Sequence, residues 1–341
     1  MDITKIEQLI EKLSRNDKIL FNRFYSVRVY ESKSKVQKKV ISVIKRRFGS
    51  IKKIEYQEIV CINNNLTGEG SLFNKLRSSR PMRKIKINMH EFEKKEGCFF
   101  CDIMNKTPED IFGRIKGKYC MTASNLAKYD YFHGLIIFNE HNPFKIKKPW
   151  LKDYLEVAYK WFKKVENIDR FAKYHFLIWN HLWKAGASIV HGHMQITSSK
   201  IQYGKIKKFE EIVSYYKRKY KSNYFLDLFK IHKNLGLGRK VDRCNVLFYL
   251  TPIKEKEIFI FTKEKSFIIL SNLIYKIIQN YIKVGVQSFN LALFKIKDYW
   301  IVRIVDRGRL ENSHCDIGSM ELYGNSVIST DPFVLASKFK L

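Results

Sequence analysis

The side chains best suited to chemistry lie in one short run of this sequence, Gly186-Ala187-Ser188-Ile189-Val190-His191-Gly192-His193-Met194-Gln195. Residues two positions apart on an extended strand point to the same face, so a strand over 188–196 would direct His191, His193 and Gln195 toward one ligand. A single histidine on an apolar strand is typical of a satisfied core residue, and this is our interpretation of His175 and His232. Two histidines and a glutamine after a turn of small residues indicate a reactive site instead.

A Cys-x-x-Cys pair, Cys98 and Cys101, predicts a metal site, because two thiolates at this spacing can occupy two corners of a tetrahedral zinc site. His141, just past an expected strand end, and His191 offer the other two ligands. Four protein ligands would make the zinc structural. A redox pair is the alternative, but the residues after Cys101 give poor support for the helix that a thioredoxin-type site needs. The remaining cysteines are expected to be free thiols: Cys61, Cys120, Cys244 and Cys315.

With the other histidine of the run assigned to the metal, His193 is the free imidazole and the expected nucleophile. A neutral imidazole needs no proton removed before it attacks phosphorus. Arg77 and Arg80 are candidates for shielding the phosphate oxygens, since guanidinium groups bind them bidentately. The Ser188 hydroxyl and the Gln195 amide can donate to the same group. Because glutamine, unlike a third histidine, cannot act as an acid, it favours a leaving group that is already stable as an anion, such as a sugar phosphate or pyrophosphate.

These motifs resemble those of the galactose-1-phosphate uridylyltransferase family, of the histidine-triad superfamily, over residues 60–200. Leu66-Thr67-Gly68-Glu69 followed by Arg77-Ser78-Ser79-Arg80-Pro81 is similar to a first-half segment of the family, and the two cysteines, His141 and His191 match its zinc ligands. The resemblance implies that His193 becomes covalently uridylylated, that Gln195 steadies the phosphoryl group, and that Arg77 and Arg80 approach the nucleotide phosphates. It also implies substrate-binding roles for Asn125, Asn180, Gly186 and Ser188.

The second half of the chain is less similar to the family. Residues 317–324 are similar to its Gly-x-Glu sugar-binding stretch, which would place Glu321 near a hexose, although a surface helix turn explains this glutamate equally well. Common bacterial members bind a second metal with a His-x-His pair, and no such pair follows His193. Only His232 and His314 remain there, so the sequence supports one zinc per chain.

The resemblance implies an enzyme that moves a nucleoside monophosphate, UMP in the family, between hexose 1-phosphates through a covalent nucleotidyl-histidine, as a homodimer. The alternatives are a nucleotide-sugar phosphorylase of the ADP-glucose type, a dinucleotide phosphorylase and an enzyme that removes AMP from nucleic-acid ends. Gln195 disfavours the last.

Charge raises one alternative of another class. The 341 residues include 64 Lys and Arg against 33 Asp and Glu, a net charge of +31, which suits a polyanionic partner and allows a basic nucleic-acid-binding module without turnover. The lysines accompany many Ile, Asn, Tyr and Phe residues, a mix typical of AT-rich coding, and no stacking platform or zinc-finger spacing is present. We therefore do not expect nucleic acid as a partner. No secretory signal and no membrane span are evident, so we expect a cytoplasmic protein without a membrane partner.

Hydrophobic patterning predicts the elements that must position these residues. Residues 1–52 are expected to form a basic helical segment. From residue 53, short strands surround a helix over 150–165, and the same order of strands and helix recurs after residue 200. With the family resemblance, this predicts an α+β fold of two histidine-triad-like halves, 53–200 and 201–341, with mostly antiparallel sheets and crossing helices.

Overall fold

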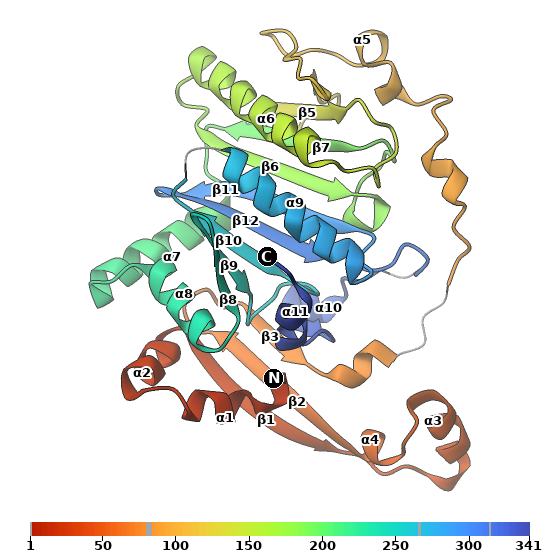
Figure 1. Cartoon of the computed structure of the whole chain (residues 1–341), viewed down its shortest axis with the longest axis vertical. Coiled ribbons are helices and arrows are strands. Elements are labelled where there is room, and N and C mark those ends of the chain that lie inside the picture. The colour runs from red at the N-terminus through yellow and green to blue at the C-terminus, as the bar shows by residue number, and fades with distance from the viewer. Residues whose placement is uncertain (1, 80–83, 265–266, 314) are drawn as a thin grey trace.

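The computed structural model describes residues 2–79, 84–264, 267–313 and 315–341. A nine-stranded sheet, antiparallel throughout, runs through its upper part in the order β4-β5-β7-β6-β11-β12-β10-β9-β8 (Figure 1). The strands are β4 (Cys120–Ser124), β5 (Phe132–Phe138), β6 (Tyr174–His181), β7 (His193–Ser199), β8 (Gly238–Val241), β9 (Cys244–Phe248), β10 (Ile258–Thr262), β11 (Phe289–Ile296) and β12 (Tyr299–Asp306).

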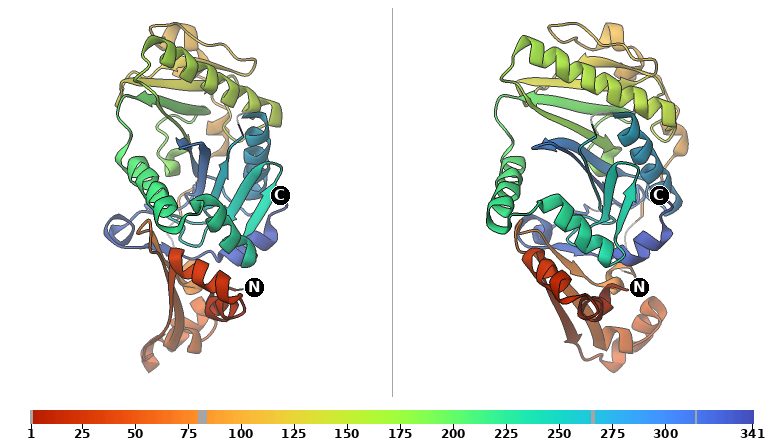
Figure 2. Two further views of the ribbon diagram at one scale, coloured as in Figure 1. Left: turned by 90° about the vertical axis from the view of Figure 1, so that its left-hand side faces the viewer. Right: turned by 60° about the vertical axis from the view of Figure 1, so that its left-hand side comes forward.

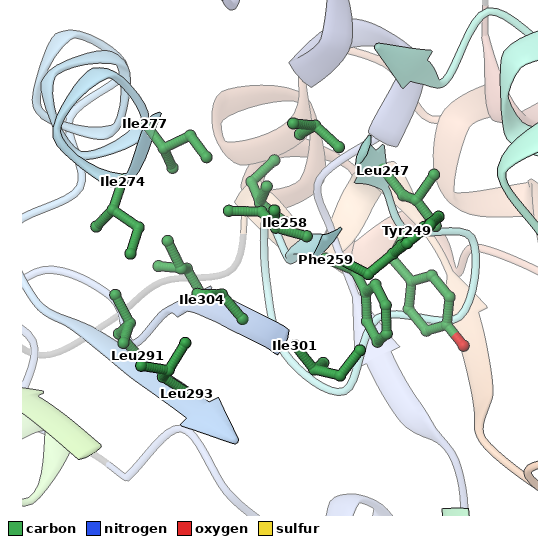
Figure 3. Packing of buried hydrophobic residues seen from close by; sticks show 14 of the residues in the cluster. Leu247, Tyr249, Ile258, Phe259, Ile274, Ile277, Leu291, Leu293, Ile301 and Ile304 are labelled. Carbon is green, nitrogen blue, oxygen red and sulfur yellow. The ribbon is translucent and has the colours of Figure 1, made fainter. Parts of the chain in front are cut away.

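Two long helices, α6 (Lys148–Ile168) and α9 (Phe267–Lys283), pack against each other and cover one face of this sheet. Figure 3 shows Ile274 and Ile277 of α9 above Leu291 and Ile304 of the sheet, and all four side chains are buried. Figure 2 shows α7 (Gly204–Tyr220) on the opposite side of the sheet from α9. Gly134 of β5 faces Trp161 of α6, so the next residue, Leu135, and its partner Gln195 on β7 lie on the face opposite α6 and α9. No helix in the described part of the chain is long and apolar enough to cross a membrane.

The two halves of the sheet repeat one another in register. The series β4-β5-α6-β6-β7 recurs as β9-β10-α9-β11-β12, and the halves meet where β6 pairs with β11. Gln195 of β7 lies opposite Leu135 and Ile178, and Arg303 of β12 lies opposite Phe259 and Ala292 in the same arrangement. The predicted α+β fold of two similar halves is confirmed.

A second, four-stranded sheet lies below the first, with the order β1-β2-β3-β13 (Figure 1). Its strands are β1 (Tyr25–Lys33), β2 (Tyr56–Asn64), β3 (Gly70–Phe73) and β13 (Ser326–Ile328). The prediction that residues 1–52 are helical is wrong for β1, which pairs with β2 over nine residues. Val27 and Val29 alternate with exposed residues and pack on the core, a pattern of period two. The boundary predicted between residues 52 and 53 separates two paired strands.

The remaining helices are short. They are α1 (Ile6–Glu11), α2 (Arg15–Phe24), α3 (Ile41–Phe48), α4 (Lys52–Glu55), α5 (Ile103–Lys106), α8 (Tyr224–Asn234), α10 (Ser319–Tyr323) and α11 (Pro332–Lys338). The helix α3 and the short helix α4 lie in the connection between β1 and β2.

Candidate active site and metal centre

The four predicted metal ligands, Cys98, Cys101, His141 and His191, converge, and one ligand atom from each lies within 4.8 Å of all the others. The Nδ1 atom of His191 lies 3.5 Å from each sulfur and 3.2 Å from Nδ1 of His141. Zinc bonds of about 2.0–2.3 Å in tetrahedral geometry place ligand atoms roughly 3.3–3.8 Å apart. The observed spacing and the Cys2His2 donor set therefore fit zinc.

The surroundings of the four ligands affect the protonation of His191 and Cys101, and so their ability to bind a cation. The Nε2 atom of His191 lies 2.7 Å from the Phe138 carbonyl oxygen, so Nε2–H donates there and Nδ1 keeps its lone pair for a metal. Burial, together with the neighbouring Cys98 sulfur, raises the pKa of the Cys101 thiol to about 11. A divalent cation would reverse this shift by stabilising the thiolate. Among the described residues no other group of three or more potential ligands comes together.

The strand predicted from Ser188 begins later, because β7 starts at His193. Residues 188–192 form a loop over Phe138. The Gly192 backbone lies so close to the Phe138 ring that a Cβ atom on residue 192 would be 2.5 Å from it. The expectation that three side chains share one strand face is therefore wrong for His191, whose ring turns to the metal ligands. The Phe100 ring packs edge-on against both histidines, with centroids 5.9 Å from His191 and 5.1 Å from His193.

The side chain of His193 is 7% exposed and is held in one tautomer. Its Nδ1 atom lies 2.8 Å from the His191 carbonyl oxygen, so Nδ1–H donates and Nε2 carries the lone pair. Burial lowers the pKa of His193 below its usual value, which favours the neutral ring. Nε2 is thus the atom able to act as a nucleophile.

Two side chains that the sequence did not indicate orient Gln195. Its Oε1 atom lies 3.0 Å from the Tyr129 hydroxyl and 3.0 Å from Nε2 of His133. The Tyr129 backbone N–H donates to Nδ1 of His133 at 3.5 Å, which leaves the His133 proton on Nε2 to donate to Gln195. Since both donors occupy Oε1, the Gln195 amide NH2 is the group left for a substrate. Asn125 lies beside this cluster, with Nδ2 3.0 Å from Nε2 of His133, but both atoms are donors in this His133 tautomer, so they form no hydrogen bond.

Asn180 is the next-to-last residue of β6 and lies on the same sheet face as Gln195, since it is two residues from Ile178, which pairs with Gln195. Its Oδ1 atom accepts from Nδ2 of Asn290 at 2.8 Å, and the Asn290 Oδ1 atom accepts from Arg307. Asp316 holds the Arg307 guanidinium with two bonds, of 2.8 and 2.7 Å. This polar row from the second half was also not indicated by the sequence, since its members become neighbours only through the β6–β11 pairing.

The other predicted residues lie in turns and short helices. Gly186 adopts a left-handed φ of 92° at the end of a 3-10 turn, and Ser188 is exposed two residues later. Glu321 lies in α10, where its carboxylate accepts from the Gly318 N–H at 2.9 Å and so caps its own helix. Arg77 lies in the 3-10 helix Lys75–Ser79, which follows β3 of the lower sheet, and β3 lies far from β7 (Figure 1). Arg80 lies outside the described residues.

The matching position of the second half has different chemistry. When the two halves are aligned by their strand pairs, Ile301 occupies the position of His193. Arg303 likewise corresponds to Gln195, and Glu257 corresponds to His133. Arg303 forms ion pairs with Glu257 and Glu69, and the other Glu69 oxygen accepts from the Tyr249 hydroxyl at 3.0 Å. The second half therefore has no nucleophilic imidazole at this position, and Glu69 ties it to the lower sheet.

No protein-family model matches this sequence, and no curated protein matches it. Three solved structures share its architecture. An ADP-glucose phosphorylase from Arabidopsis thaliana has 14% sequence identity and a TM-score of 0.62, and the match covers 82% of this chain and 97% of that one. A galt-like protein from Arabidopsis thaliana matches with 15% identity, a TM-score of 0.57 and coverage of 80% and 95%. A uridylyltransferase matches with 12% identity, a TM-score of 0.58 and coverage of 82% and 96%. The chain thus has the fold of these uridylyltransferase, galt-like and phosphorylase structures, as the sequence resemblance implied.

Proposed function

We propose that this protein is a nucleotidyltransferase that moves a nucleoside monophosphate, UMP, between hexose 1-phosphates through a covalent intermediate on His193. The observation that carries the proposal is the geometry of His193, whose Nδ1–H donates to the His191 carbonyl at 2.8 Å and leaves Nε2 able to attack. The Gln195 amide beside it donates to phosphoryl oxygens but supplies no proton.

In the first step Nε2 attacks the α-phosphorus of a nucleotide sugar, a P–N bond forms, and the P–O bond to hexose 1-phosphate breaks. The leaving group departs as a stable phosphate anion, so the step needs no general acid. In the second step an oxygen of another sugar phosphate attacks the same phosphorus, and the imidazole is released neutral. The Gln195 amide stabilises charge on the phosphoryl oxygens in both steps.

The Cys98, Cys101, His141 and His191 cluster would hold a structural zinc. With all four positions filled by protein, a zinc there would supply rigidity rather than a site for substrate. His191, whose carbonyl accepts from His193, would be held in place by this site and so would position the nucleophile through the backbone. The substrate-binding roles of Arg77, Arg80, Asn125, Asn180, Gly186, Ser188 and Glu321, and the homodimer, stay predictions.

Incubation with UDP-glucose labelled in the α-phosphate tests the proposal. The wild-type protein should retain acid-labile label, and His193→Ala should retain none. His90→Ala removes an exposed histidine and should label as the wild type does. Labelling of His193→Ala at the wild-type level would refute the assigned nucleophile.

Phosphorolysis of a nucleotide sugar is the second candidate, because the structure with a TM-score of 0.62 is an ADP-glucose phosphorylase. It shares the first step and differs in the acceptor. Labelled protein should therefore be chased separately with inorganic phosphate and with galactose 1-phosphate. Release of a nucleoside diphosphate by phosphate alone would replace the transferase with the phosphorylase, and repetition with ADP-glucose identifies the base.

A further inference from the structure

The connection between β1 and β2, residues 34–55, forms a projecting tip that we call the basic tip. Figure 1 shows α3 and α4 at the far end of the β1–β2 hairpin, away from the nine-stranded sheet. Every residue of β1 from Tyr30 onward is exposed, and none in α3 or α4 is buried. The basic tip therefore stands clear of the hydrophobic core.

The charge of the basic tip is mostly positive. It contains one acidic residue, Glu55, whose carboxylate accepts from the Val36 backbone N–H at 3.4 Å, and eight basic residues: Lys35, Lys38, Lys39, Lys45, Arg46, Arg47, Lys52 and Lys53. All eight are exposed, and in the described part of the chain none forms an ion pair or a side-chain hydrogen bond. Cations elsewhere are often paired, as Lys230 is with Asp17 and Lys200 with Asp169. Repulsion among unpaired cations costs stability, so this concentration of charge needs another explanation than folding.

The remainder of the basic tip is mostly aliphatic. The α3 helix is amphipathic, with Ile41, Ile44 and Phe48 half-buried on one side. Val40 and Val43 are 42% and 44% exposed and lie among the cations. Strong amphipathicity, a cationic polar face and low overall hydrophobicity characterise helices that lie in a membrane interface.

We propose that the basic tip docks this protein on an anionic lipid surface, with Lys45, Arg46 and Arg47 meeting headgroups and Val40 and Val43 entering the acyl boundary. The sequence predicts no membrane partner because no spanning segment is evident in it, but docking on a lipid surface needs no such segment.

A nucleic-acid partner fits the basic tip less well. Nucleic-acid surfaces combine cations with aromatic stacking platforms and amide side chains that read bases. The basic tip has one aromatic residue, the half-buried Phe48, and one amide, Gln37, against seven aliphatic residues. Exposed aliphatic side chains gain nothing from a phosphate backbone, but they gain free energy beneath lipid headgroups.

Co-sedimentation of the full chain with vesicles tests the proposal. The wild type should bind phosphatidylcholine vesicles that contain about 30% phosphatidylserine, and binding should weaken in high salt and without the anionic lipid. The triple variant K45Q/R46Q/R47Q should bind roughly a hundredfold more weakly, at about one kcal/mol per cation. The matched control K205Q/K207Q/K208Q removes three exposed, unpaired cations from α7 and should bind as the wild type does. V40S/V43S should bind roughly tenfold more weakly even in low salt.

Nucleotide labelling and the melting temperature should not change in these variants, since the substituted side chains are exposed, and α3 lies at the opposite end of the molecule from β7 (Figure 1). Equal loss of vesicle binding in both triple variants would overturn the proposal, because it would show a general effect of net charge. Tighter binding of RNA or DNA than of vesicles, lost in K45Q/R46Q/R47Q, would overturn it in favour of nucleic acid. A change of oligomeric state in V40S/V43S would overturn it in favour of a contact between copies.

Discussion

Gly192, between the two histidines of the candidate site, offers a sharp test of how the nucleophile is positioned. A Cβ atom at this residue would lie 2.5 Å from Cδ2 of Phe138, where ordinary contacts begin at 3.4 Å. The φ angle of Gly192 is not left-handed, so an alanine backbone is allowed there and the cost of Gly192→Ala is steric. The ring cannot swing away freely, since it stacks on Tyr154 at 3.9 Å and packs edge-on against Trp179.

About 0.9 Å of movement must therefore be shared between the Phe138 ring and the backbone that carries His191 and His193. A misplacement of about 1 Å at a reacting group costs roughly a hundredfold in rate. Overpacking a buried site costs about 1–3 kcal/mol of stability. We expect Gly192→Ala to remain folded and to form nucleotidyl-His193 roughly a hundredfold more slowly.

Single-turnover labelling by quenched flow measures this rate, and Phe138→Val in the same chain should restore most of it, because valine has no δ carbon to meet the new Cβ atom. Gly204→Ala is the matched control, because nothing lies within 4 Å of a Cβ atom there. Labelling of Gly192→Ala at the wild-type rate, or no recovery in the double variant, would refute the steric account.

Three further substitutions probe the metal centre, the amide contact and the second half. Cys98→Ser should lower the zinc content, measured by mass spectrometry, well below one ion per chain. It should also lower the unfolding midpoint, because the metal's binding free energy contributes to folding. Full zinc content in this variant would contradict the ligand set. Tyr129→Phe removes one of the two donors to the glutamine amide oxygen and should slow labelling about two- to tenfold without changing the melting temperature; an unchanged rate would show that the contact does not matter. Arg303→Met leaves Glu257 buried without its cation and should cost about 3–5 kcal/mol in urea unfolding, whereas Arg243→Met, in an exposed pair, should cost less than about 1 kcal/mol; equal losses would refute the difference.

Local sequence was enough to indicate the four potential metal ligands that converge in the structure, and to single out His193 as the candidate nucleophile. Cys98 and Cys101 share one tight turn, and His191 and His193 are two residues apart, so residue type and spacing limited the chemistry before any fold was known. The order of strands and helices also indicated two similar halves. The local pattern gave a wrong prediction at two places. At β1 the alternation of period two was hidden among basic residues that predict a helical segment, and residues 188–192 form a loop over Phe138, so that the strand begins only at His193.

The tertiary structure alone decided how these residues are supported. Tyr129 and His133 reach Gln195 across more than sixty residues of sequence, and Asn290 reaches Asn180 across 110. Glu69 pairs with Arg303 across 234 residues, and that pair occupies the position matching the first half's Gln195. Such contacts depend on which strands pair and in what register, and a sequence pattern of period two fixes only the face to which a side chain points. The sequence thus indicated which side chains are suited to react, whereas strand pairing determined the contacts that orient Gln195 and placed Ile301 at the position in the second half that matches His193.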